Sequence, residues 1–250
     1  MTPRILGAVA ARVLNQLRHD HRTMAMLLLV PMLLMTLLWW MFQDVGTVFD
    51  RFGPAMLAMF PFIIMFLVTS VTTLRERSSG TLERLLAMPT GKVDFLGGYA
   101  VAFGVVAAVQ SALAVALCVW VLDLDLAGPA WMLTVVAVGD ALLGTALGLF
   151  VSAFARTEFQ AVQFMPAVVI PQILLCGLFV PRDQLPRVLE VVSDVLPLSY
   201  AVDAMNNVAA TASDAFAGVD PEVWTDLVVI GGFVLGLLLL GAATLRRRTA

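Results

Sequence analysis

The stretch Leu74–Pro89, LRERSSGTLERLLAMP, lies between two long apolar segments and carries three arginines and two glutamates. Its second half predicts a short helix, because Leu82, Leu85 and Leu86 recur at a spacing that places them on one side. Pro89 cannot continue the helix and therefore marks its end. Two interpretations stay open: an amphipathic element that passes a mechanical signal to a soluble partner, or a basic loop that only orients the protein.

The beginning of this predicted helix carries its own signals. Gly80 is an acceptable N-cap residue. Glu83 lies at the third helical position, where its charge is near the positive end of the helix dipole. These signals favour a helix over the second half of the charged stretch.

The composition places the whole chain in a membrane. Of its 250 residues, 60% are hydrophobic and 13% are charged, whereas a soluble domain is about half apolar and a quarter charged. Basic patches with interleaved aromatic residues are missing, which argues against a nucleic-acid partner. We therefore expect an all-α integral membrane protein with one transmembrane domain over residues 1–250.

Six apolar segments have the length and composition of membrane-spanning helices. They run from about 24–42, 54–74, 95–122, 129–154, 159–180 and 227–245. The fourth contains the sequence GTALG, in which Gly144 and Gly148 are four residues apart. That spacing permits close contact with another helix.

The N-terminal residues 1–22 are basic and periodic. Their apolar side chains recur at helical spacing and are Ile5, Leu6, Val9, Val13 and Leu17. This pattern predicts an amphipathic helix lying in the membrane interface, and the alternative is a frayed terminal tail. His19 and His21 lack a third metal ligand, so we interpret them as solvated interface residues.

The segment 181–226 is the longest that does not span the membrane. Between Pro186 and Pro197 it carries an apolar cluster that is too short to cross a bilayer. We expect short re-entrant or interfacial helices over Leu185–Tyr200, between spans five and six, acting as a gate or lid at the outer side.

The distribution of positive charge predicts the orientation. If both termini are cytoplasmic, twelve of the fifteen lysines and arginines fall in cytoplasmic segments. All the tryptophans then fall at outer ends of spans: Trp39, Trp40, Trp120, Trp131 and Trp224. The sequence thus predicts a multi-pass protein of the cell (cytoplasmic) membrane with both termini in the cytoplasm.

Catalytic motifs are missing from the sequence. We predict no catalytic residue, no cofactor-binding residue and no metal ligand, since HExxH, GxSxG and metal-ligand clusters are lacking. A phosphate-binding P-loop is also lacking, so ATP, if used, is bound by another chain. Cys118 and Cys176 lie inside apolar segments and do not form a disulfide framework.

Asp140 is the one acidic residue inside a predicted span. A carboxylate at membrane depth is costly and marks a functional candidate. Two roles stay open for it, namely coupling to protons and a structural hydrogen bond.

At two segments the sequence resembles the permease subunits of type-2 ABC exporters, which export drugs or polysaccharides. The first is RERSSGTLERLLAMPTGK at 75–92, which is similar to the loop of that family that contacts the ATPase. The second is CGLFVPRDQLPRVLEVVSDVLPLSYAVDAM at 176–205, which carries the family's spaced Gly, Pro, Leu-Pro and Pro-Leu-Ser/Thr-Tyr elements. The short loops favour the drug- or lipid-export branch, and the carbohydrate-export branch stays open as the alternative.

The resemblance assigns roles to these residues. The ATPase-coupling residues would be Arg75, Glu76, Arg77, Gly80, Thr81, Leu82, Glu83, Arg84, Leu85, Leu86 and Pro89. The outer-gate residues would be Gly177, Pro181, Leu185, Pro186, Pro197, Leu198, Ser199 and Tyr200.

The resemblance also implies the partners. We expect a permease dimer, either a homodimer or a pair with a related permease, in contact with membrane lipid and with two ABC ATPase subunits. Those subunits would bind ATP and magnesium and would drive alternating access. The chain would be a transport subunit that moves an amphiphilic small molecule, drug or lipid outward. The alternative is an ion- or proton-coupled secondary transporter that uses Asp140.

Overall fold

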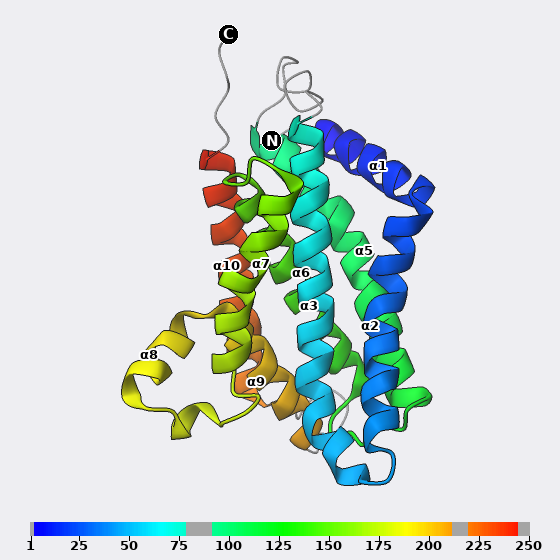
Figure 1. Ribbon diagram of the computed structural model, residues 1–250, viewed down its shortest axis with the longest axis vertical. Helices are drawn as coiled ribbons and strands as arrows, with labels where there is room; N and C mark the ends of the chain where they lie inside the picture. Colours follow the sequence, from blue (N-terminus) through cyan, green and yellow to red (C-terminus); the bar gives the residue numbers. More distant parts are fainter. Residues whose placement is uncertain (1–2, 79–91, 212–219, 245–250) are drawn as a thin grey trace.

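The computed structural model describes residues 3–78, 92–211 and 220–244, and over these ranges every regular element is a helix. Figure 1 shows most of the helices running side by side, with α8 projecting from the flank of the bundle. The elements are α1 (Pro3–His19), α2 (His21–Phe42), α3 (Gly46–Ser78), α5 (Lys92–Trp120), α6 (Ala130–Ser152), α7 (Glu158–Leu175), the 3₁₀ turn η1 (Arg182–Gln184), α8 (Arg187–Val195), α9 (Pro197–Ala210) and α10 (Pro221–Thr244).

Six of these helices are long and apolar enough to cross a membrane: α2, α3, α5, α6, α7 and α10. The predicted fold class, an all-α membrane protein with six spans, is therefore confirmed. Figure 1 shows α1 and the ends of α6 and α10 at one end of the bundle, which we call the terminal end. The opposite end, where α2 ends and α10 begins, is called the far end.

The packing of α3 against α6 depends on two glycines. A Cβ atom on Gly144 would lie 2.4 Å from the carbonyl oxygen of Phe62, and one on Gly148 would lie 2.6 Å from that of Phe66. Real Cβ atoms do not approach a backbone oxygen so closely. The close helix contact predicted from GTALG is thus confirmed, and α3 and α6 form the centre of the bundle.

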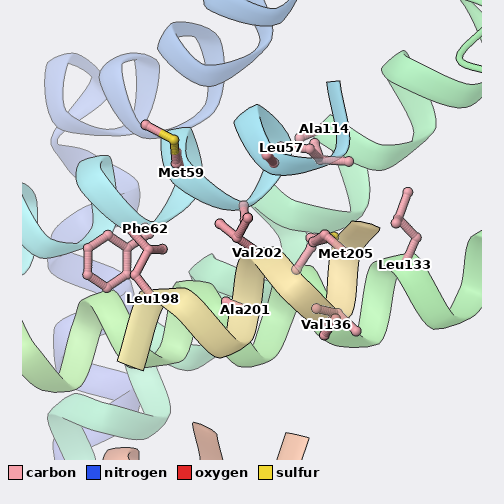
Figure 2. Packing of buried hydrophobic residues seen from close by; sticks show 14 of the residues in the cluster. Leu57, Met59, Phe62, Ala114, Leu133, Val136, Leu198, Ala201, Val202 and Met205 are labelled. Atoms are coloured by element: carbon pink, nitrogen blue, oxygen red, sulfur yellow. The ribbon is translucent and has the colours of Figure 1, made fainter. Parts of the chain in front are cut away.

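The short helix α9 belongs to the buried core. Figure 2 shows its side chains gathered with those of α3 and α6 in one cluster. Its buried members include Leu198, Ala201, Val202 and Met205, none of which exposes any surface. Because α9 is packed on several sides, it is a fixed part of the bundle.

The N-terminal helix α1 is amphipathic, as predicted from its periodicity. Val9, Val13 and Leu17 are buried, and α1 packs against α5, where a Cβ on Gly98 would lie 2.6 Å from the side chain of Val9. Part of the apolar face of α1 is therefore covered by protein. Its placement in a membrane interface stays a prediction.

The helix α3 corrects two predicted boundaries. The predicted spans 24–42 and 54–74 left residues 43–53 between them as a connection, but the helix runs from Gly46 to Ser78. At its start, Phe49 is buried in the core and stabilises the first turns ahead of Pro54. At its end, the helix continues through Arg75, Glu76 and Arg77, which the sequence had placed in a loop.

The fifth and sixth predicted spans have different bounds in the structure. Helix α7 ends at Leu175 instead of residue 180, because Gly177 adopts a φ of 88°, a left-handed conformation that ends helices. Helix α10 starts at Pro221 instead of residue 227. There the amide of Glu222 donates to the Asp220 carboxylate at 2.9 Å, which caps the helix.

The tryptophans lie at one end of the bundle. Each lies in the part of its helix that is at the far end of the bundle. Trp39 and Trp40 are in the last turn of α2, Trp120 is at the end of α5, Trp131 is in the first turn of α6 and Trp224 is in the first turn of α10. This grouping matches an aromatic belt at one membrane face. Which compartment that face meets stays a prediction.

Candidate functional site

At the terminal end, the last turn of α3 is held by an ion pair with α1. Arg12 of α1 donates one hydrogen bond to Glu76 of α3 at 2.9 Å and another to the hydroxyl of Tyr99 of α5 at 2.8 Å. The Glu76 side chain is only 8% exposed, and the Arg12 guanidinium compensates the charge of its carboxylate. Arg12, Glu76 and Tyr99 thus join three helices at one point, and we call them the α3-end cluster.

A second ion pair joins the same turn to α7. Arg75 donates two hydrogen bonds to Glu158, at 3.0 and 3.2 Å. Both side chains are at least half exposed, and exposed pairs contribute only ~0–1 kcal/mol each. The pair therefore adds orientation more than stability. Through it, the end of α3 is connected to α7 as well as to α1 and α5.

The predicted coupling residues divide into two groups. Arg75, Glu76 and Arg77 form the last turn of α3. The remainder lie outside the described residues: Gly80, Thr81, Leu82, Glu83, Arg84, Leu85, Leu86 and Pro89. The role of Arg12 and Tyr99 was missed, because Arg12 lies 64 residues before Glu76 and 87 residues before Tyr99, and no local pattern reveals such contacts.

The far end contains a cavity of about 1020 Å³. Its wall is formed by the start of α3, the segment that follows α7, and parts of α9 and α10. Most of the charged residues lining it are acidic; the acids are Asp50, Asp125, Asp183, Asp203, Glu222 and Asp226, and the bases are Arg51 and Arg182. Of the predicted outer-gate residues, Gly177 and Pro181 line this cavity.

The other outer-gate residues lie beside the cavity or away from it. Pro197, Leu198 and Ser199 are buried in the first turn of α9, whereas Leu185 and Pro186 connect η1 to α8. The prediction of two short helices over Leu185–Tyr200 agrees with α8 and the start of α9. That these helices re-enter a membrane stays a prediction.

Arg182 is a residue of this region that sequence reasoning missed. Its guanidinium donates hydrogen bonds to Asp194 of α8 and to Asp203 of α9, and it lies over the ring of Tyr200, 5.1 Å from the centroid. It directly follows Pro181, which was assigned to the gate, and this position inside the motif was the available signal.

Asp140 is fully buried in α6. Neither of its carboxylate oxygens has a hydrogen-bond partner among the residues that the structure describes. The structural hydrogen bond considered for it therefore finds no partner within residues 3–78, 92–211 and 220–244. Over the same ranges, no group of three or more His, Cys, Asp or Glu side chains could hold a metal ion.

Comparison with known proteins identifies relatives along most of the chain. The profile of the family described as ABC-2 type transporter matches residues 5–209. The Escherichia coli protein named "Probable multidrug ABC transporter permease YbhR" is 31% identical over 152 residues, which cover 60% of this chain and 41% of that protein. The Bacillus subtilis "Linearmycin resistance permease protein LnrN" is 24% identical over 179 residues, covering 70% of this chain and 44% of that protein.

A eukaryotic protein is also similar. "ABC transporter G family member 20" of Dictyostelium discoideum is 23% identical over 199 residues, which cover 80% of this chain and 27% of that protein. In each of these comparisons the matched part spans less than half of the relative's own length. The shared part includes the α3-end cluster and most of the cavity wall, since the family match runs from α1 into α9.

Proposed function

Because this chain belongs to the ABC-2 type transporter family and is a membrane permease, we propose that it works as the export subunit of a transporter powered by a separate ATPase. The family match over residues 5–209 is the observation that carries this proposal. The lack of a P-loop in the sequence agrees with it, since ATP and magnesium would then be bound by two partner ATPase subunits. The permease itself would have no catalytic site.

The α3-end cluster supports a route for mechanical coupling. The segment 79–91 follows directly on the last turn of α3, and that turn is tied to α1, α5 and α7 by the contacts of Arg12 and Arg75. A displacement of the segment by an ATPase would therefore act on several helices together. Closure of the ATPase dimer would in this way reach the bundle and drive alternating access.

The far-end cavity suits an exit site. It lies at the opposite end of the bundle from the α3-end cluster, and α3 and α6 extend toward both ends. We propose that an amphiphilic small molecule, drug or lipid leaves at this end, through a pair of permeases that is either a homodimer or a dimer with a related chain. The names of the relatives, with multidrug and linearmycin resistance, favour the drug-efflux branch.

The orientation follows from the same proposal. We expect the terminal end to face the cytoplasm in the cell membrane, since the basic residues concentrate there. A cysteine replacing Ala215 should react with a membrane-impermeant reagent added to intact cells, and one replacing Ser79 should not. The opposite labelling pattern would show that the proposed orientation is wrong.

A second function is favoured by the buried carboxylate of Asp140, which has no hydrogen-bond partner in the described part of the chain. In an ion- or proton-coupled secondary transporter this group would carry the coupling ion. Asp140→Asn keeps the shape of the side chain and removes its charge. If ATP drives transport, we expect the variant to retain transport that depends on ATP and that persists without a proton gradient.

The measurement needs a transport substrate. Compounds are first screened for stimulation of ATP hydrolysis by the purified permease–ATPase complex, and a compound that stimulates it is used as the substrate. Uptake of that compound into proteoliposomes is then compared for the wild type and Asp140→Asn, with ATP and with an imposed proton gradient. Loss of transport in Asp140→Asn, with assembly and ATP hydrolysis unchanged, would favour the secondary transporter.

A further inference from the structure

Helix α8 is attached to the bundle with little packing of its own. Ser193 is its one buried residue, whereas Val188 is 74% exposed and Val195 is 66% exposed. Figure 1 shows the helix projecting from the flank of the bundle. Within the described part of the chain, α8 is therefore attached to the bundle mainly by polar contacts.

Arg182 supplies the central polar contact. One of its terminal nitrogens binds Asp194, in the last turn of α8, and the other binds Asp203 of α9. The guanidinium also lies over the ring of Tyr200. A single side chain in η1 thus joins α8 to α9 through two charge-assisted hydrogen bonds, which are about twice as strong as neutral ones.

Smaller contacts support the same arrangement. The hydroxyl of Tyr200 donates to the carbonyl oxygen of Asp194 at 2.7 Å. The hydroxyl of Ser193 donates to the carbonyl oxygen of Leu175, at the end of α7, at 2.8 Å. The same hydroxyl lies 3.0 Å from the hydroxyl of Ser199. These contacts meet at the junction of α7, α8 and α9.

The two helices that Arg182 connects differ in how firmly they are held. Helix α9 is packed into the core, so Asp203 is a fixed anchor. The segment from Phe179 to Leu196 has Ser193 as its one buried residue, so it is held mainly by polar contacts, and its first part, through Asp183, forms one wall of the far-end cavity. Moving this segment would therefore change the width of the cavity.

We propose that Arg182 is a positioning residue that latches α8 to α9, and that breaking its ion pairs releases the segment Phe179–Leu196 and opens the far-end cavity. The use of this movement as an exit gate rests on the proposed export function. The latch itself does not, because it follows from the contacts of Arg182 alone. Its test can therefore be separated from the test of transport.

The latch is tested by a distance between spin labels. Cysteines replacing Val188 in α8 and Val228 in α10, both 74% exposed, are labelled in the full chain in lipid nanodiscs and diluted with unlabelled chain. The native Cys118 and Cys176 are fully buried, and a sample without the two added cysteines measures their background. The wild type should give one narrow distance distribution.

Arg182→Gln should raise the population at displaced distances about tenfold, which corresponds to ~1.4 kcal/mol. The matched control is Arg187→Gln, which removes the same charge from the neighbouring helix, where Arg187 is exposed and pairs only locally with Glu190. Its distribution should equal that of the wild type. Equal effects of the two substitutions, or no effect of Arg182→Gln, would overturn the latch.

A second variant distinguishes the latch from general destabilisation. Asp194→Asn changes a carboxylate that is more than half exposed, so it should leave thermal unfolding unchanged while reproducing the displaced population. The double variant Arg182→Gln with Asp194→Asn should match Arg182→Gln alone, because both remove the same contact. Additive effects of the two changes would contradict the proposal.

The gate is tested by adding ATP to the labelled permease in complex with its ATPase. If the export function holds, ATP should populate the displaced distances in the wild type. If the latch holds and the export function does not, Arg182→Gln will still shift the distances and ATP will have no effect.

Discussion

Gly144→Ala and Gly148→Ala should each lower the thermal unfolding temperature of the purified protein by about 2–12 °C, the shift expected for ~1–3 kcal/mol of overpacking in a chain of this size. The added Cβ atom would meet a backbone carbonyl oxygen of α3 at 2.4 or 2.6 Å. A carbonyl within a helix cannot rotate away as the end of a flexible side chain can. The strain must therefore separate α3 from α6, the pair at the centre of the bundle.

The control substitutions lie in α10. A Cβ on Gly231 or Gly236 would have no neighbour within 4 Å, so Gly231→Ala and Gly236→Ala should leave the unfolding temperature unchanged or raise it slightly, since alanine is the better helix former. Fluorescence-detected size exclusion after heating steps measures all four variants. If Gly144→Ala behaved like Gly236→Ala, the packing of α3 on α6 described here would be wrong.

Features that depend on local sequence could be predicted well. The six spanning helices follow from the length and hydropathy of each apolar segment, and both are properties of the segment alone. The close contact at Gly144 and Gly148 was also predictable, because small residues four apart leave a flat helix face. The partner of that face, α3, was not, since the spacing carries no information about which helix meets it.

Helix boundaries were less predictable where the signals of proline and glycine competed with packing. Pro54 suggested a helix start, yet α3 begins at Gly46, because Phe49 is buried against the core. Gly177 was assigned to the gate but also ends α7, which only its positive φ reveals. These outcomes depend on tertiary contacts that a single segment does not encode.

The contacts of the candidate site were the least predictable. Glu76 looked like one charge in a basic loop, but it is buried and paired with Arg12, 64 residues earlier. Arg182 received no role in the sequence analysis, although it lies between the motif residues Pro181 and Leu185 and joins α8 to α9. Charged side chains can pair with many partners, and only the folded bundle shows which pairs form.

The second large effect is expected at Leu85 and Leu86, in the stretch proposed to contact the ATPase. If these side chains enter a groove of the ATPase, each contributes ~1.5–3 kcal/mol through burial, whereas an exposed ion pair contributes ~0–1 kcal/mol. Leu85→Asp together with Leu86→Asp should therefore weaken binding by on the order of a hundredfold or more. Arg84→Glu should mainly affect specificity and the rate of assembly.

The most direct test of the coupling proposal is a pull-down of the ATPase with the affinity-tagged, detergent-solubilised permease. The wild type and Arg84→Glu should bring down an ATPase subunit, and the double variant Leu85→Asp with Leu86→Asp should not. The size-exclusion profile of the permease should be the same for all three, which excludes unfolding as the cause. An ATPase that stays bound to the double variant, with transport intact, would contradict the account and leave Leu74–Pro89 as an ordinary charged loop.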